Sequence, residues 1–438
     1  MTKILTNKSN IDLDYPICRP SLDLDFTQEE LDPRITFTRG SIGTRVNRNR
    51  VIETVAANTP RFDYDPVTGE CKGLLIEESR SNLFTYSDDA ATAWGIKSGL
   101  TVSANTDIAP DGNQTMDTLV EDAARNDKYL ERQITVNANQ NITWSCYVKP
   151  LRRTNIFLVI YDGASYSNNV NFRYEFSNQT VTLSAAFGTG TFGSYSVVYV
   201  GNGVYRMVLS GQPTTSASTS VRIRIGFVNQ SSTYTGTGVS AAAVWGAQLE
   251  VGAFPTSYIP TSASTVTRSA DLADMTGTNF SSWYNQSEGT LYADLNNITT
   301  RTSLTFDRLV SLVGTDVNRN AISICTQTAA GGGAQNKFLA GVSYSPDGSY
   351  VLDTFTGVVS GGGPDRIGKA IIVYKKDNFA FTVNGITPLR DIIGDIPTCN
   401  RLLIFGAARY QPAPSGHIKR LTYYPRALKP NQLVLLTQ

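Results

Sequence analysis

Apolar and polar residues alternate one by one through the middle of the chain. In residues 142–149 (ITWSCYVK) every second side chain is apolar, so Trp144 is expected to face a core. This period of two is that of a β-strand with one buried face, and turn sequences such as Asp162-Gly163 separate the runs. The same alternation recurs in residues 170–176, 221–227 and 243–250. Many short antiparallel strands at this spacing predict that residues 86–262 form a β-sandwich.

A second set of short strands follows residues 256–270, which are rich in Ser, Thr and Pro and typical of a domain boundary. Two triple-glycine segments, 331–333 and 361–363, precede neither a Lys-Ser/Thr pair nor a helix, so we expect loops rather than phosphate-binding turns. Residues 271–438 are predicted to form a second sandwich, which ends in a short helix beginning at Pro430. Its expected strands are residues 289–295, 308–313, 321–325, 338–344, 370–375, 379–384, 402–407 and 417–424.

Residues 1–85 show no sustained period, because proline and charged residues interrupt short apolar patches such as residues 22–26 (LDLDF) and 73–76 (GLLI). We expect an irregular attachment arm that lies over another structure. The arm contains a run of arginines with no acidic residue among them before Glu53. These arginines form a basic patch for a partner, belong to a solvated loop, or pair with nearby acids. They are Arg34, Arg39, Arg45, Arg48 and Arg50.

Composition narrows the classes of function. The net charge is +1 and the pI about 7.5, so no overall field attracts nucleic acid or an acidic membrane surface. His417 is the single histidine, which excludes sites that need two or more histidines, such as histidine-based zinc clusters and two-histidine facial triads. The 5 cysteines lie far apart and predict free thiols in a reducing cytosol. No apolar run approaches a membrane-spanning length, and residues 1–10 lack the apolar centre of a signal peptide.

Residues 61–66 (RFDYDP) are followed by residues 73–83 (GLLIEESRSNL). Together they resemble a segment found in many bacteriophage virion proteins, including tail fibres, head fibres and spikes. The resemblance extends over residues 22–87. It implies a structural protein of the virion, assembled in the cytoplasm of the bacterial host. Residues 1–85 would then anchor it to other capsid or tail proteins, through the five arginines named above.

Two further stretches resemble known folds. Residues 90–258 are similar to the jelly-roll carbohydrate-binding modules attached to that virion segment. Residues 416–428 (GHIKRLTYYPRAL) resemble the last strand of concanavalin-like and laminin-G-like sandwiches. The resemblances imply an all-β protein with a jelly roll over residues 86–262 and a concanavalin/laminin-G-like sandwich over residues 271–438. The jelly-roll similarity rests on residues 109–112 (APDG), 203–206 (GVYR), 245–250 (WGAQLE) and 258–261 (YIPT).

Sugar recognition needs flat aromatic rings for the C–H face of a pyranose, and amide, carboxylate or arginine groups for its hydroxyls. Tyr129 shares a strand face with Glu131, while Tyr161 and Tyr166 flank a loop. These four are the candidate carbohydrate-binding residues. The alternative for each tyrosine is a ring covered by the opposite sheet or by a neighbouring chain. Trp245 lies on an apolar face and is expected in the core.

Neither a metal site nor a catalytic pair is evident. Asp107, Asp111 and Asp117 lie close in sequence but lack the DxDxDG spacing, so no cofactor is predicted and Ca²⁺ is the one ion left open. A glycosidase needs two carboxylates roughly 5–10 Å apart. The acids of residues 271–438 are scattered, and Glu288 is the only glutamate among them. We therefore predict no catalytic residue and no enzymatic activity.

The preferred hypothesis is a virion fibre or spike that presents lectin-like sandwiches to glycans of the bacterial surface. By analogy with other fibres we expect a homotrimer, although the sequence has no coiled-coil heptads. One alternative is a purely structural connector of the capsid or tail, with its aromatic residues buried at protein interfaces. A less favoured alternative is a polysaccharide depolymerase. No nucleic acid and no membrane insertion are expected.

Overall fold

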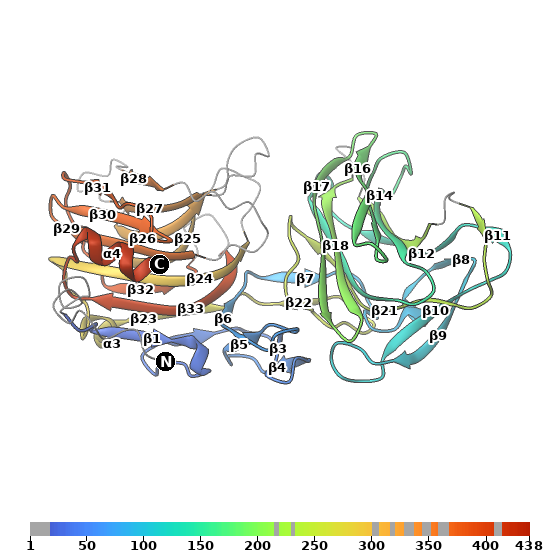
Figure 1. Cartoon of the computed structure of the whole chain (residues 1–438), viewed down its shortest axis with the longest axis horizontal. Helices are drawn as coiled ribbons and strands as arrows, with labels where there is room; N and C mark the ends of the chain where they lie inside the picture. The colour runs from blue at the N-terminus through green and yellow to red at the C-terminus, as the bar shows by residue number, and fades with distance from the viewer. Residues whose placement is uncertain are drawn as a thin grey trace, which may run out of the picture.

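The protein consists of two β lobes joined side by side, as the computed structural model shows (Figure 1). The predicted all-β fold with two antiparallel sandwiches is confirmed. The two triple-glycine segments lie outside the described residues, as does the beginning of the arm. The structure describes residues 18–213, 219–228, 233–299, 306–315, 320–327, 337–343, 352–357, 368–406 and 414–438.

The jelly-roll lobe contains two six-stranded antiparallel sheets packed face to face. The first sheet has the order β17 (Thr191–Gly201), β18 (Val204–Gln212), β13 (Ile142–Pro150), β21 (Ser240–Val251), β10 (Met116–Glu121) and β9 (Leu100–Asp107). The second has the order β16 (Thr180–Phe187), β15 (Asn169–Glu175), β14 (Asn155–Asp162), β19 (Ser220–Phe227), β12 (Lys128–Thr135) and β8 (Ile96–Ser98).

Alternation in the sequence explains most of this core. Trp144, Phe172 and Ile225 each project from the apolar face of a predicted strand and are fully buried between the two sheets. Trp144 packs against Phe84 and Trp94, with ring centroids 6.0 and 5.8 Å away. Aromatic pairs at such separations contribute stability beyond the burial of their area. The prediction that Trp144 lies in the core is confirmed.

The alternation expected through residues 243–250 is wrong in one respect. Ala247 and Leu249 face the inter-sheet core, but Trp245 faces the opposite side of its sheet. The register between β13 and β21 shifts at this point, and Gly246 has a φ of +63°, which glycine adopts without strain. This bulge moves Trp245 to the outer face, where Tyr258 covers it. Trp245 is still buried, as predicted.

The C-terminal lobe is a sandwich of an eight-stranded and a seven-stranded sheet. The larger has the order β31 (Leu389–Asp391), β30 (Phe379–Val383), β29 (Gly368–Lys375), β24 (Glu288–Thr299), β33 (Ser415–Tyr424), β6 (Cys71–Ile76) and β5 (Arg61–Tyr64), with β1 (Leu22–Asp25) also paired to β33. The other has the order β2 (Thr36–Thr38), β23 (Leu272–Thr276), β32 (Arg401–Ile404), β25 (Phe306–Val313), β26 (Ala321–Gln327), β27 (Lys337–Ser343) and β28 (Leu352–Gly357).

The described part of the expected arm is not a separate segment. It supplies strands to both sheets of the C-terminal lobe, because β1 and β6 pair with β33 and β2 pairs with β23. Its apolar patches are therefore the buried faces of strands: Leu22, Leu24 and Leu74 lie in the core of that lobe. The reason is long-range pairing, which a local sequence pattern does not reveal.

Short elements complete the fold. The expected helix at Pro430 is confirmed as α4 (Pro430–Thr437), which packs on β29 and β30. The remaining paired strands are β3 (Gly43–Val46) with β4 (Ile52–Val55), β7 (Arg80–Asn82) with β22 (Val266–Arg268), and β11 (Arg125–Asn126) with β20 (Tyr234–Thr235). The remaining helices are η1 (Phe26–Gln28), α2 (Ala90–Ala93) and α3 (Gly277–Ser281).

A buried group of charged side chains joins the lobes. Arg61 donates to Glu77 at 2.8 Å and also to Asp271, while Arg39 bonds the other oxygen of Asp271 at 3.0 Å. Ser257, from the segment that closes the jelly roll, donates its backbone N–H to Glu77 at 2.7 Å. Charges buried to this extent are stable only when they are paired. We call this group, completed by Arg268, the interlobe clasp.

Candidate functional site

The four predicted carbohydrate-binding residues lie together on the outer face of the second jelly-roll sheet. Antiparallel register places Glu131 of β12 opposite Arg224 of β19, and Arg224 opposite Val159 of β14. Tyr129 and Tyr161 flank this row on the same face, because side chains two residues apart on a strand point the same way. The face is therefore built by three neighbouring strands, whose alternation also buries the opposite side.

Arg224 is the centre of this cluster. Its guanidinium carbon lies 3.7 Å from the ring centroid of Tyr129, 5.0 Å from that of Tyr161 and 5.6 Å from that of Tyr166. It also forms two hydrogen bonds to Glu131 Oε2, at 3.0 and 2.5 Å. Each cation–π contact contributes roughly 0.5–1 kcal/mol at a partly exposed site. Two charge-assisted hydrogen bonds to one carboxylate oxygen fix the position of the guanidinium, so the three rings are arranged around one cation.

Tyr166 reaches the cluster from the loop between β14 and β15. Its hydroxyl donates to Glu131 Oε1 at 2.8 Å, and its ring centroid lies 5.1 Å from that of Tyr161. Asp162 shapes the loop by accepting the N–H of Ala164, and Asn169 donates its amide to the carbonyl of Tyr166 at 3.1 Å. Nearly half of the Tyr166 surface, 48%, remains exposed. The loop thus presents one ring to solvent in a fixed orientation.

Five polar residues of this face were not predicted as site residues. They continue the face across β19 and β15, since Arg222 pairs with Tyr161, and Tyr161 with Asn169. The guanidinium of Arg222 lies 4.7 Å from the ring centroid of Tyr166. The sequence pattern had placed Arg222 and Arg224 on the polar side of a strand, but register across strands is what groups them with tyrosines. The additional residues are Arg222, Arg173, Asn169 and Asn171, besides Arg224 at the centre.

Strand β15 contributes polar atoms that the described protein leaves unsatisfied. The Oδ1 atoms of Asn169 and Asn171 are buried without a hydrogen-bond partner, and so is Nε of Arg173. Both asparagines are only 8% exposed. Buried polar atoms are nearly always paired in proteins, so each exception needs a reason other than stability. We call the surface formed by these residues and by Tyr129, Glu131, Val159, Tyr161, Tyr166, Arg222 and Arg224 the Tyr–Arg face.

Tyr161, Tyr166 and Arg224 each keep one charge state around neutral pH. Burial raises the pKa of the Tyr161 hydroxyl, although Arg224 opposes this effect. Burial also raises the pKa of Tyr166, and the hydrogen bond to Glu131 raises it further. Burial on its own would lower the pKa of Arg224, but Tyr161 and Glu131 raise it above its ordinary value. Tyr161 and Tyr166 therefore remain neutral and Arg224 remains charged at neutral pH.

The five predicted anchoring arginines have different environments. Arg39 is buried in the interlobe clasp, with 1% of its surface exposed, so the prediction that it contacts a partner is wrong. The others are paired within the chain: Arg34 with Asp32, Arg45 with Glu53, and Arg48 with Glu29. Arg50 donates to the carbonyl of Thr68 at 3.4 Å. Pairing with nearby acids, one of the three alternatives, describes Arg34, Arg45 and Arg48.

The aspartates considered for calcium do not converge. Asp107 pairs with Lys149 at 2.8 Å. Asp117 accepts backbone N–H groups from Ala90 and Asn105. Asp111 shapes its own turn by accepting from Asn113. Among the described residues, no group of three or more His, Cys, Asp or Glu side chains is placed to hold a metal ion.

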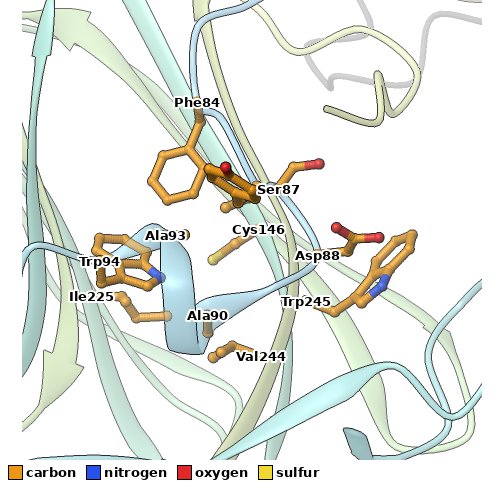
Figure 2. A pocket seen from close by; sticks show the side chains of 12 residues that line it. Phe84, Ser87, Asp88, Ala90, Ala93, Trp94, Cys146, Ile225, Val244 and Trp245 are labelled. Atoms are coloured by element: carbon orange, nitrogen blue, oxygen red, sulfur yellow. The ribbon is translucent and has the colours of Figure 1, made fainter. Parts of the chain in front are cut away.

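Two hollows lie away from the Tyr–Arg face. Figure 2 shows the first, around Trp94, Cys146 and Trp245, with a volume of about 10 Å³. At about the size of one water molecule it has no room for a sugar. The second is a groove of about 660 Å³ in the C-terminal lobe, between α3 and β32, with Tyr284 and Arg401 on its walls. None of the predicted site residues lines either hollow.

Comparisons with known proteins give partial likenesses of the sandwiches. No protein-family model matches the chain. No curated protein matches it either. The CBM40 of the Ruminococcus gnavus IT-sialidase, bound to α2,6-sialyllactose, is 13% identical with a TM-score of 0.29, over 36% of this chain and 88% of that one. Domain 4 of AbnA, a GH43 extracellular arabinanase from Geobacillus stearothermophilus, in complex with arabinotriose, is also 13% identical, with a TM-score of 0.28 over 42% and 82%. Mouse laminin α1 domains LG4-5 are 10% identical, with a TM-score of 0.21 over 78% and 93%.

None of the helices in the described ranges has both the length and the apolar character that crossing a membrane requires. The Tyr–Arg face is the surface of the jelly roll where tyrosine rings, arginines and a carboxylate meet.

Proposed function

We propose that this chain is a glycan-binding structural protein of a bacteriophage particle, and that the Tyr–Arg face of its jelly roll binds the sugar. One observation carries the sugar-binding part: Tyr129, Tyr161 and Tyr166 are arranged around the Arg224–Glu131 pair on one sheet face. Rings of this kind pack on the C–H side of a pyranose, while the guanidinium and carboxylate bond its hydroxyls.

The particle role has a different support. It rests on the resemblance of residues 22–87 to a segment of virion proteins. Attachment to a capsid or tail would use surfaces other than Arg39, which lies inside the protein. Several copies on one particle would raise the avidity of weakly binding sites through effective concentration. Imaging purified particles with this chain labelled tests the role, and a label absent from the particle would contradict it.

Binding is tested by replacing Tyr166 with alanine. Tyr166 is exposed and its ring covers Tyr161, so its removal should weaken binding to host surface polysaccharide by about tenfold or more with little effect on folding. The matched control is Tyr199→Ala on β17, whose ring is exposed to a similar degree, 42%, on the other sheet. Equal binding by both variants and the unaltered protein, measured by calorimetry, would refute the assignment.

We propose binding without catalysis. In the C-terminal lobe, Asp274 pairs with Arg401, Glu288 with Lys375 and Asp395 with Lys376. Each of these carboxylates is held by its own basic partner, whereas a glycosidase places two of them across one cleft. Incubation with polysaccharide followed by chromatography tests the depolymerase alternative. Release of oligosaccharides would overturn the non-catalytic proposal, and intact polymer is expected.

A further inference from the structure

The Tyr–Arg face carries more positive charge than its own carboxylates neutralise. Three arginines, Arg173, Arg222 and Arg224, project from β15 and β19 on this side. Glu131 is committed to Arg224 and to the Tyr166 hydroxyl. Within the described chain, no carboxylate lies within 4.0 Å of the guanidinium of Arg222 or Arg173. The whole chain has a net charge of +1, so this concentration is local.

The two arginines without a carboxylate partner have different surroundings. The Arg222 guanidinium lies over the ring of Tyr166, at 4.7 Å from its centroid. Nε of Arg173 is buried with no hydrogen-bond acceptor. A buried donor without an acceptor is unfavourable, and more so when it is charged. An anionic group from outside the chain would supply the counter-charge that neither guanidinium has among the described residues.

The neighbouring positions do not supply that anion. In the cross-strand register, Arg173 lies opposite Phe157 of β14 on one side and opposite Leu183 of β16 on the other. Glu175, two residues further along β15, bonds Ser177 at the strand end instead. Arg222 therefore borders Tyr161 and Tyr166, while Arg173 lies two rows further along the same face, where its charge still acts on Tyr161. A ligand that packs on the rings of Tyr161 and Tyr166 therefore has the positive charge of Arg222 next to it.

We propose that the Tyr–Arg face selects acidic glycans, whose carboxylate, sulfate or phosphate groups pair with Arg222 and Arg173 while the sugar ring packs on Tyr161 and Tyr166. This inference rests on the proposed sugar-binding function and specifies the substrate class of the same site. Arginine suits the role because its planar fork bonds an oxyanion through two parallel N–H groups. A neutral sugar leaves both guanidinium groups without a counter-charge.

The test compares matched glycan pairs that differ only in charge. Immobilised polygalacturonic acid is paired with its fully methyl-esterified form, and sulfated glycans with their desulfated forms. The unaltered full-length protein should bind the acidic member at least tenfold more tightly. This preference should shrink as the salt concentration rises from 50 to 500 mM, because a partly exposed ion pair is screened. Binding without preference overturns this inference and leaves the proposed function standing. No binding to either member of any pair overturns both.

Variants assign the preference to named side chains. Arg222→Gln and Arg173→Gln should each reduce the acidic-to-neutral affinity ratio about three- to tenfold while binding of the neutral member changes little. Arg222→Lys keeps the charge and should retain part of the ratio, which separates loss of charge from loss of folding. The control Arg390→Gln removes an exposed arginine of the C-terminal lobe and should leave the ratio unchanged. A ratio unaffected by Arg222→Gln and Arg173→Gln overturns the assignment.

Discussion

Asp271 shows how much of the architecture depends on single side chains. It bonds Arg39 at 3.0 Å, contacts Arg61, and accepts the backbone N–H of Glu77 at 2.9 Å, all in the buried interlobe clasp. Asp271→Asn keeps the shape but breaks the Arg39 ion pair and leaves Arg61 with Glu77 alone, so we expect destabilisation by about 3–5 kcal/mol in urea unfolding. Asp395→Asn, which removes an exposed ion pair with Lys376, should change stability by less than about 1 kcal/mol. Equal effects of the two substitutions would contradict a structural role for the clasp.

The site residues show what alternation along one strand reveals. It placed Tyr129 and Glu131 on a common face, and it placed Tyr161 and Tyr166 beside one loop. It could not show that Arg224 lies opposite Glu131, because cross-strand register depends on pairing between segments far apart in sequence. Arg222 and Arg224 therefore looked like solvated positions of a strand. The sequence did contain one signal for them: two arginines, two residues apart, on the polar side of a predicted strand.

At the scale of elements, Gly73 marks where the N-terminal segment enters the C-terminal sandwich. Its φ is +91°, and a Cβ at this position would lie 2.2 Å from the carbonyl oxygen of Ile418 on β33. Gly73→Ala should therefore push β6 from β33 and destabilise the C-terminal lobe by about 3 kcal/mol or more in calorimetry. Gly238→Ala is the control, since its φ of +72° is similar but nothing lies within 4 Å. Gly238→Ala should lower the free energy of unfolding by about 1–2 kcal/mol. An equal loss of stability in both variants would refute the explanation that β6 and β33 approach closely at Gly73.

The sequence predicted the strands that alternate clearly, but not the short strands with distant partners or the bulge in β21. Strands with strict alternation, such as β13 and β19, were found close to their observed bounds because every second residue of each is apolar and buried in the core. β1 alternates leucine with aspartate over only 4 residues and β2 has only 3 residues, so neither stands out. Their partners, β33 and β23, come hundreds of residues later. The bulge at Gly246 was missed because one left-handed glycine inverts the phase of all residues after it.

For the whole molecule, the interlobe clasp predicts that the two lobes move as one body and separate in acid. The Glu77 carboxyl is fully buried, which would raise its pKa, but Arg268 and Arg61 hold that pKa well below its ordinary value of 4.5. A carboxyl whose pKa is lower in the folded state contributes stability at pH values above 4.5, and that contribution is lost as the pH falls below it. Small-angle scattering should therefore show one compact particle at neutral pH and a longer one at low pH.

Replacing Glu77 with glutamine imitates its protonated form and removes the charge that Arg61 and Arg268 share. We expect the longer particle already at neutral pH, together with two separate unfolding transitions in calorimetry, because each sandwich retains its own core. Glu70→Gln is the matched control, since Glu70 pairs with Lys419 on the surface and its side chain is 67% exposed. A compact Glu77→Gln protein with a single transition would mean that packing alone holds the lobes together. The presenting surface of the jelly roll would then be fixed by contacts other than this clasp.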